Sequence, residues 1–377
     1  MATGFLWDER FAWHDAGRAS QSPWAEPYPA LDRPESKRRL RNLLEVSGLL
    51  QHLAPLAARP ATETELLRFH SHAYLKRVRA LSENGGGDAG ESAVLGPGGY
   101  EIASLAAGGC IEAVDAVLRG EVDNAYALVR PAGHHAEPER GRGFCIFGNI
   151  AIAVHHAKAV RGIERVAVVD WDVHHGNGTQ MAFYDDPTVL TVSLHQEHCY
   201  PVDSGGIEET GTGAGHGFNL NLPLPPGAGH GAYLAAFEQI VLPMLRAFRP
   251  ELIMVACGLD AGINDPLGRM LCFSESFRCM TRHLKALAGE VCDGRLVLCH
   301  EGGYSPTYAP FCGLAVIEEL SGERSEVVDP MAAWYARMGG QMLQPHQARL
   351  LERLARRITV LAGPEPARPA ARRRVAS

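Results

Sequence analysis

The sequence predicts an α/β fold in which a mainly parallel β-sheet is covered by helices on both faces. Short apolar runs rich in β-branched residues recur through the chain, and helix-like segments lie between them. Unbroken apolar strands that alternate with helices are typical of a parallel sheet buried on both sides. The expected strands are residues 125–129, 166–170, 189–194, 252–257 and 296–299, and the expected helices are residues 102–118, 232–248 and 274–288.

The composition favours a globular enzyme. The chain has 377 residues, of which 46% are hydrophobic and 21% charged, and its net charge is −7. Basic residues form no stripe, and the C-terminal run Arg372-Arg373-Arg374 is short, so nucleic-acid binding has little support. The nine cysteines include no CxxC pair, which argues against a disulfide framework and against a cysteine zinc site.

The chain shows no sign of secretion or of a membrane span. Its first residues lack a basic region followed by an apolar stretch, as a secretory signal requires. No run of about 18 apolar residues occurs. We therefore expect a cytoplasmic protein without membrane contact.

The chain divides into a catalytic domain, residues 1–325, and a helical extension with a basic tail, residues 326–377. Within the extension, residues 342–361 have the pattern of an amphipathic helix. This helix either docks on its own domain or forms a subunit contact in a homo-oligomer. Three long loops, residues 82–99, 201–217 and 223–231, are candidates for lids or site walls.

Polar residues that suit a metal follow two of the expected strands. Asp170, Asp172 and His174 alternate after strand 166–170, so in an extended chain their side chains share one face. Asp260 follows strand 252–257. Two carboxylates and one imidazole leave a coordination position open, as catalytic zinc sites do, while Fe²⁺, Co²⁺ and Mn²⁺ remain alternatives. Asp265 precedes a proline, which predicts that it is a turn residue.

Two further strands end in candidate catalytic residues. His134 and His135 follow strand 125–129, and imidazole can exchange protons near neutral pH. Tyr304 follows strand 296–299 and two glycines, and a phenol can donate a hydrogen bond to a developing oxyanion. A second pair, His155 and His156, lies in a helix-like stretch and reads as structural. Because ligands bind at the carboxyl ends of parallel strands, all four strand ends should meet in one site.

Taken together, six motifs resemble the histone deacetylase superfamily, and in particular its bacterial class II amidohydrolases. The resemblance implies the three-layer arginase–deacetylase fold and covers roughly residues 15–320. The motifs are RPAGHHAEP (130–138), GFCIFGNIAIA (143–153), VDWDVHHGNGTQ (169–180), TVSLHQ (191–196), ACGLDAGINDPLG (256–268) and EGGYSP (301–306).

The resemblance implies a role for each matched residue. Three residues bind a zinc ion, or Fe²⁺ in its place. The two histidines act as general acid and base, and each has one hydrogen-bond partner. A tyrosine stabilises the transition state. Asparagine as the second histidine's partner is similar to class II, where class I has aspartate. The implied ligands are Asp172, His174 and Asp260, and the implied catalytic residues are His134, His135, Asp170, Asn177 and Tyr304.

The resemblance also implies a substrate tunnel and structural potassium. Tyr200 departs from the usual phenylalanine of the tunnel wall, and Leu267 stands where polyamine-selective members have glutamate. The implied substrate-binding residues are Gly143, Phe144, Tyr200, Leu267 and Gly302. Potassium is expected at Asp170, Asp172, His174, Ser193 and Leu194, and a second potassium ion is expected near Phe183, Asp186, Val189 and Phe218.

The function that the resemblance implies is metal-dependent hydrolysis of an acyl amide. The substrate is either an acetyl-lysine-type side chain or a small acylated amine, and an acetylpolyamine is the alternative. A non-catalytic protein that binds acyl ligands is a hypothesis of another class. A ureohydrolase on the related arginase scaffold is disfavoured, because the carboxylates for a second metal are absent after His174 and Asp260.

Overall fold

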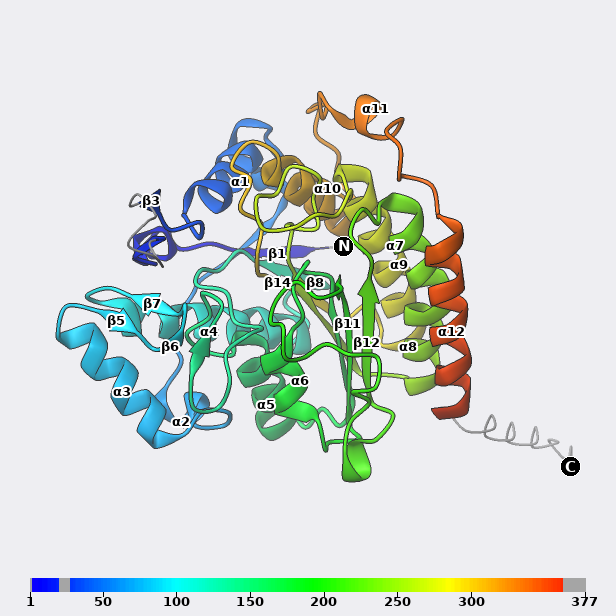
Figure 1. Cartoon of the computed structure of the whole chain (residues 1–377). Coiled ribbons are helices and arrows are strands. Elements are labelled where there is room, and N and C mark those ends of the chain that lie inside the picture. Colours follow the sequence, from blue (N-terminus) through cyan, green and yellow to red (C-terminus); the bar gives the residue numbers. More distant parts are fainter. Residues whose placement is uncertain (1, 20–27, 362–377) are drawn as a thin grey trace, which may run out of the picture.

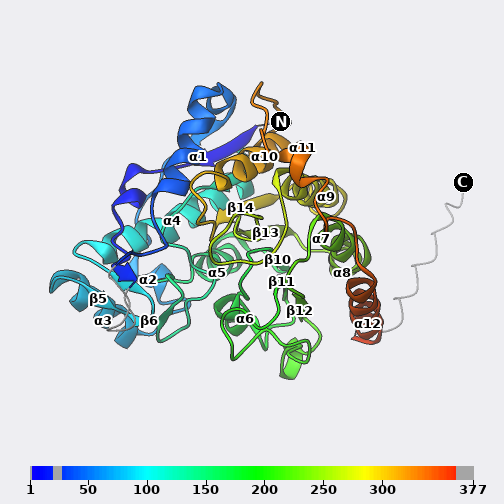
Figure 2. The ribbon, with the colours of Figure 1, turned by 45° about the horizontal axis from the view of Figure 1, so that its top comes forward.

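A computed structural model describes residues 2–19 and 28–361 of the chain. The tail run 372–374 lies outside these residues. In the described part, a parallel sheet of eight strands forms the centre of the molecule (Figures 1 and 2). Its spatial order is β12 (Asn219–Leu224), β11 (Val189–Gln196), β10 (Val166–Asp170), β13 (Leu252–Cys257), β14 (Leu296–His300), β8 (Asn124–Ala127), β1 (Thr3–Leu6) and β4 (Ala54–Leu56).

The sheet confirms the α/β class and its parallel strands, since every pairing between neighbouring strands is parallel. Strands β10 and β13 have the bounds that the sequence predicts. Three strands, β1, β4 and β12, were not predicted. Strands β1 and β4 are only four and three residues long, and β12 carries Asn219, Asn221 and Pro223, so it lacks an unbroken apolar run.

Helices cover both faces of the sheet and give the three-layer architecture (Figure 1). One apolar core lies between the sheet and a first layer, and a second core lies between the sheet and the other layer. The first layer contains α1 (Glu35–Val46), α7 (His230–Ala236), η4 (Phe237–Val241), α8 (Leu242–Phe248), α9 (Ser274–Val291) and α10 (Ala309–Ser321). The second contains α3 (His72–Glu83), α4 (Gly99–Leu118), α5 (Asn149–Arg161) and α6 (Asn177–Phe183).

The expected helices are present, and the structure differs from the prediction in one helix and in one loop. The single helix expected at 232–248 is continuous but contains the π-helical segment η4 between α7 and α8. The loop expected at 82–99 contains three two-residue strands, β5 (Gly87–Asp88), β6 (Gly90–Glu91) and β7 (Val94–Leu95). Strand β6 pairs with β9 (Gly141–Arg142), which ties this loop to the segment after the histidine pair.

The remaining short elements lie around the three layers. They are η1 (Glu9–Trp13), β2 (Arg18–Ala19), β3 (Tyr28–Pro29), η2 (Leu49–His52), α2 (Glu63–Leu66), η3 (Gly213–Gly215) and α11 (Ala332–Tyr335). In the described part of the chain, no helix combines the length and the apolar character that a membrane span needs.

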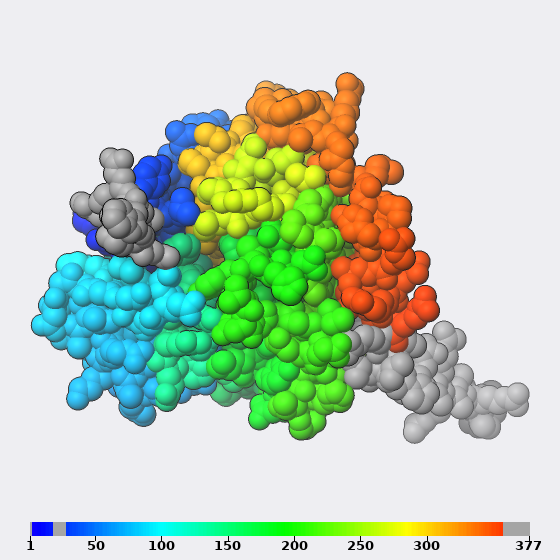
Figure 3. Space-filling model, in the orientation of Figure 1, coloured from blue at the N-terminus to red at the C-terminus, as the bar shows by residue number. Residues whose placement is uncertain are grey.

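The C-terminal extension runs along one side of the molecule (orange and red in Figure 3). Its helix α12 (Pro345–Leu361) packs against α7 and η4. Leu351 and Leu354 are buried in the first core, so this helix docks on its own chain. Docking on its own domain is one of the two arrangements that the amphipathic pattern of residues 342–361 allows.

Candidate active site

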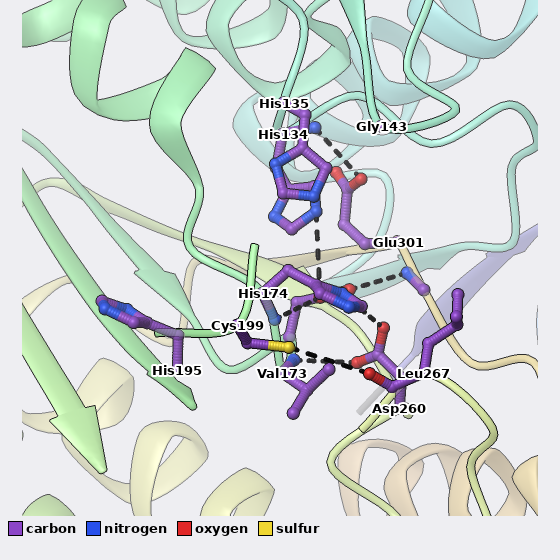
Figure 4. Close-up of polar contacts among 12 residues, drawn as sticks. His134, His135, Gly143, Val173, His174, His195, Cys199, Asp260, Leu267 and Glu301 are labelled. Atoms are coloured by element: carbon purple, nitrogen blue, oxygen red, sulfur yellow. Dashed lines mark hydrogen bonds and ion pairs between the residues drawn. The ribbon is translucent and has the colours of Figure 1, made fainter. Parts of the chain in front are cut away.

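Four neighbouring strands, β10, β13, β14 and β8, bring their carboxyl ends to one edge of the sheet. The chemistry-bearing motifs of the sequence analysis follow these four strands. Backbone hydrogen bonds join the segments after the strands: Glu301 donates to Cys257, and Leu259 donates to Gly302. Residues far apart in the sequence are thereby placed in one buried cluster (Figure 4).

Asp172, His174 and Asp260 converge as the sequence analysis expected. One ligand atom of each lies within 4.8 Å of the others, and all three residues are buried. Nδ1 of His174 lies 3.0 Å from Oδ1 of Asp172 and 3.3 Å from Oδ2 of Asp260. Oδ2 of Asp260 has no hydrogen-bond donor. A buried carboxylate oxygen without a donor is costly unless a cation pairs with it, so this donor set fits a divalent metal.

Gly302 lies against the same carboxylates. Its backbone N–H donates to Oδ2 of Asp172 at 2.8 Å. A Cβ atom at this position would lie 2.0 Å from Oδ2 of Asp260, so only glycine leaves room for the cluster. The sequence analysis expected Gly302 in the substrate tunnel, whereas the structure places it at the carboxylate cluster.

Each histidine of the pair donates from Nδ1 to a separate acceptor. His134 donates to Oδ2 of Asp170 at 2.9 Å, and His135 donates to Oδ1 of Asn177 at 2.8 Å. The amide orientation of Asn177 is fixed, because its Nδ2 donates to the carbonyl of His135 and to Glu137. The proton of His135 is therefore on Nδ1, and its Nε2 remains able to accept one.

The two imidazoles differ in charge. Desolvation would lower the pKa of His134, but the carboxylates of Asp172 and Asp170 outweigh it and raise this pKa to about 10. Burial and the nearby charges of His134 and His174 hold the pKa of His135 well below its ordinary range. These pKa shifts favour a protonated His134 and a neutral His135. A divalent cation held by Asp172, His174 and Asp260 would reduce the negative charge that raises the pKa of His134.

Tyr304 is held at the side of this cluster. Its ring packs edge-on against the ring of Phe144, with 5.8 Å between centroids. Burial, with the carboxylates of Asp260 and Asp172, raises the pKa of its phenol well above the ordinary value, so the hydroxyl is a neutral donor. Oδ2 of Asp265 accepts the backbone N–H of Tyr304 at 2.7 Å, and its Oδ1 accepts that of Leu267. Asp265 is thus a turn residue, as its place before a proline predicts, and its contact with Tyr304 has no signal in the sequence.

A pocket of about 920 Å³ opens onto the cluster. Its lining includes the buried residues His135 and His174 and, beside them, Tyr304. Four of the expected tunnel residues also line it: Gly143, Phe144, Tyr200 and Leu267. Gly143 has a φ of +50°, and a Cβ there would lie 2.5 Å from His135 and 2.7 Å from Tyr200. Phe144 itself has a φ of +67°, which is rare for a bulky residue and is typical of functional sites.

The loop after α3 contributes contacts that the sequence analysis missed. The hydroxyl of Tyr200 donates to Oε1 of Glu91 at 3.1 Å. Nε of Arg142 lies 3.0 Å from Oε2 of the same carboxylate, and its guanidinium stands 5.7 Å from the Tyr200 ring centroid. Asp88 of the same loop also lines the pocket. The departure from phenylalanine at Tyr200 thus has a structural consequence, because the extra hydroxyl bonds this loop to the pocket wall.

A second group of potential ligands, His134, Cys145 and Glu301, lies behind the histidine pair. Oε2 of Glu301 accepts the backbone N–H groups of Gly133 at 2.7 Å and of His134 at 3.2 Å (Figure 4). Burial raises the pKa of Glu301 to about 7 and raises that of the Cys145 thiol well above its ordinary value. Through its two backbone hydrogen bonds, Glu301 supports the turn that carries the histidine pair.

The residues expected to bind the first potassium ion lie in two different surroundings. Asp170 and Ser193 line a cavity of about 10 Å³ together with polar side chains of α6, β11 and β12. Leu194 continues β11, while Asp172 and His174 face the carboxylate cluster. The second expected set lies at the start of β11, where the backbone N–H of Val189 donates to the carbonyl of Asp186 and that of Thr191 donates to the carbonyl of Phe218.

The fold and the site together define an α/β protein with a candidate metal centre at the carboxyl edge of a parallel sheet. The histone deacetylase domain profile matches residues 32–320. A histone deacetylase-like amidohydrolase of Pseudomonas aeruginosa is 52% identical over 336 residues, which cover 87% of this chain and 88% of the relative. The chain belongs to the histone deacetylase family, as the resemblance predicted.

Two further comparisons agree. A human polyamine deacetylase is 40% identical over 303 residues, which cover 78% of this chain and 45% of that protein. The crystal structure of the HDA15 HD domain matches with a TM-score of 0.84 at 30% identity and covers 95% of this chain and 94% of that one. The fold prediction is therefore confirmed.

Proposed function

We propose that the protein hydrolyses the amide bond of an acylated amine with the help of a zinc ion held by Asp172, His174 and Asp260. One observation carries this proposal. A neutral imidazole, a phenolic O–H and His174 of the buried carboxylate–imidazole cluster all line one pocket. When bound, the metal supplies a Lewis acid that polarises the amide carbonyl and acidifies water.

His135 is the group best suited to accept a proton from the attacking water. Asn177 fixes the proton of its imidazole on Nδ1, so Nε2 presents a lone pair. Burial and neighbouring positive charge favour the neutral imidazole. His134, held by Asp170, supplies the second imidazole, and a protonated histidine then donates to the departing amine nitrogen.

Tyr304 stabilises the oxyanion. A neutral phenol that is fixed before the reaction can donate to negative charge as it develops on the former carbonyl oxygen. Its backbone is held by Asp265 and its ring by Phe144. Phe144 and Tyr200 form the walls between which the chain of the acylated amine passes.

The pocket favours an acyl-lysine or a small acylated amine. Leu267 presents an apolar side chain to the pocket and offers no charge to a second ammonium group. The carboxylate of Glu91 is ion-paired with Arg142. An acetylpolyamine is the second candidate, since the human relative named above is a polyamine deacetylase and Asp88 lies in the pocket lining.

We also propose structural potassium at both expected positions. Asp170 and polar side chains line a small cavity at the first, and the backbone carbonyls of Asp186 and Phe218 accept hydrogen bonds at the second. Residues 1–325 are proposed as the catalytic domain and 326–377 as its extension, which agrees with a family match that ends at residue 320. A cytoplasmic location is proposed from the sequence.

A turnover panel tests the function. Acetyl-lysine peptides, longer acyl-lysines, acetylpolyamines and small anilides are compared with enzyme reconstituted in Zn²⁺ or Fe²⁺. We expect hydrolysis that is lost after chelation and restored by metal. The Asp260→Asn variant should lose both metal content and turnover. If no amide is hydrolysed by metal-loaded enzyme, the protein is an acyl-ligand binder instead.

A further inference from the structure

A buried lysine lies behind Tyr304, outside the pocket. Lys37 belongs to the first turn of α1, and its side chain is 2% exposed. Its ammonium lies 5.0 Å from the centroid of the Tyr304 ring, over the ring face. The proposed mechanism assigns Lys37 no role. A buried ammonium is costly to desolvate, so its position calls for a compensating interaction.

Pairing with an acidic residue does not account for this position by itself. Nζ of Lys37 lies 3.4 Å from Oδ1 of Asp32, which is a long contact. Asp32 already has a closer cation, because Nε of Arg130 lies 3.1 Å from its Oδ2 and Nη2 of Arg130 donates to its backbone carbonyl. The π face of Tyr304 gives the ammonium a second contact, at 5.0 Å from the ring centroid.

The same turn of α1 also holds the backbone before Tyr304. The hydroxyl of Ser36 donates to the carbonyl of Gly303 at 2.6 Å. On the other side, Asp265 accepts the N–H of Tyr304. These two hydrogen bonds hold the backbone at Gly303 and Tyr304, and the first of them ties it to the first turn of α1, which also carries Lys37.

We propose that Lys37 is a positioning residue that strengthens Tyr304 as a hydrogen-bond donor to the oxyanion through a cation–π contact. A cation over an aromatic face is attracted to its π electrons and draws electron density from the ring, which makes the phenolic O–H more polar. The low dielectric of the interior strengthens this effect. This inference rests on the proposed function of Tyr304.

The contact between Lys37 and Tyr304 acts on the ground state and on the transition state to different extents. The contribution should grow in the transition state, when negative charge forms beside the hydroxyl.

The test compares Lys37→Met in the wild type and in Tyr304→Phe, with an acetyl-lysine substrate and metal-loaded full-length enzyme. Lys37→Met keeps the length of the stem and removes the charge. We expect kcat to fall about 3- to 30-fold, the range that a buried cation–π contact supports, with KM within about twofold. In the Tyr304→Phe background the same change should lower kcat by less than about twofold.

Controls separate this role from a structural one. Lys158→Met removes from α5 an ammonium that is paired with Asp186, and it should leave kcat unchanged. Lys37→Arg keeps a cation and should retain kcat within about threefold. If Lys37→Met does not stay folded by circular dichroism, Lys37→Gln replaces it under the same criteria.

The outcomes separate the inference from the function on which it rests. Equal losses of kcat from Lys37→Met with and without the Tyr304 hydroxyl, or an unchanged kcat in folded Lys37→Met, overturn the role of Lys37 alone. Wild-type kcat in Tyr304→Phe overturns the proposed role of Tyr304 itself.

Discussion

At the scale of single residues, chemistry at the site depends on which atoms are already engaged in hydrogen bonds. Asn177 engages Nδ1 of His135, and Asp170 engages Nδ1 of His134, so both imidazoles present Nε2 to the cluster. Both carboxylate oxygens of Asp265 accept backbone N–H groups of the segments that carry Leu267 and Tyr304. Asp260 keeps one oxygen without a donor, and this oxygen lies 3.3 Å from Nδ1 of His174.

Removal of the Tyr304 hydroxyl should slow the reaction and leave the metal in place. In Tyr304→Phe we expect kcat to fall roughly 100- to 1000-fold, as for the loss of one oxyanion donor. Metal content measured by atomic absorption should equal that of the wild type, because Tyr304 is not a ligand. Tyr335→Phe, which removes a hydroxyl that contacts Asn264, serves as the matched control. Wild-type turnover in Tyr304→Phe would refute the oxyanion role.

Asn177→Ala should lower kcat by about 10- to 100-fold, as expected when the partner that orients a functional imidazole is lost. His135 would then lose the acceptor that fixes its proton on Nδ1. Steady-state kinetics measure the effect, and the exposed Asn84→Ala is the control. An unchanged kcat would show that His135 does not need this partner.

At the scale of elements, the pocket is built where loops from separate strands meet. The loop after α3 contributes Asp88 and Glu91, and the segment after β11 contributes Cys199 and Tyr200. The pairing of β6 with β9 and the Tyr200–Glu91 hydrogen bond join these elements. The geometry of the pocket mouth therefore depends on contacts between loops, which usually open more easily than the sheet.

Tyr200→Phe should loosen this connection without blocking the reaction. Loss of the hydrogen bond to Glu91 should increase amide hydrogen exchange in residues 87–95, measured by mass spectrometry. We expect KM for acyl-lysine peptides to change by about two- to fivefold, the equivalent of about 0.5–1 kcal/mol, with kcat nearly unchanged. Tyr184→Phe is the control. Unaltered exchange in residues 87–95 would show that this hydroxyl does not hold the loop.

At the scale of the whole molecule, a buried charge network ties the N-terminal segment to the central sheet. Nη1 of Arg130, which follows β8, donates to the carbonyls of Phe11 and His14. Its Nε and Nη2 contact the side chain and the carbonyl of Asp32. Burial alone would raise the pKa of Asp32, but the charges of Arg130 and Lys37 outweigh it and lower this pKa to about 2.

This network predicts a pH-dependent stability. A carboxyl whose folded pKa lies below its unfolded value contributes stability that is fully present above about pH 4 and is lost as the pH falls towards about 2. Asp32→Asn should lower the free energy of unfolding at pH 7 by roughly 2–5 kcal/mol. The difference from the wild type should shrink at pH 3 in urea denaturation. A difference that is constant with pH would exclude an ionised Asp32 as the source.

Much of the fold and the site could be predicted from the sequence, because both depend on local patterns. The apolar runs at Val166–Asp170 and Leu252–Cys257 define strands by themselves, and the carboxyl ends of parallel strands share one edge. From this alone, Asp172, His174 and Asp260 were expected to meet. Strand β12 escaped prediction, since Asn219 and Asn221 interrupt its apolar pattern.

What the sequence determined by itself is the α/β class, the family and the convergence of strand-end motifs, because each is encoded in short contiguous stretches. Tertiary structure alone decided that Tyr200 would donate to Glu91, that Asp265 would hold Tyr304, and that the Lys37 ammonium would lie over the Tyr304 ring. These partners come from loops and helix ends far apart in the chain. Their pairing depends on how the layers pack, and no local pattern records it.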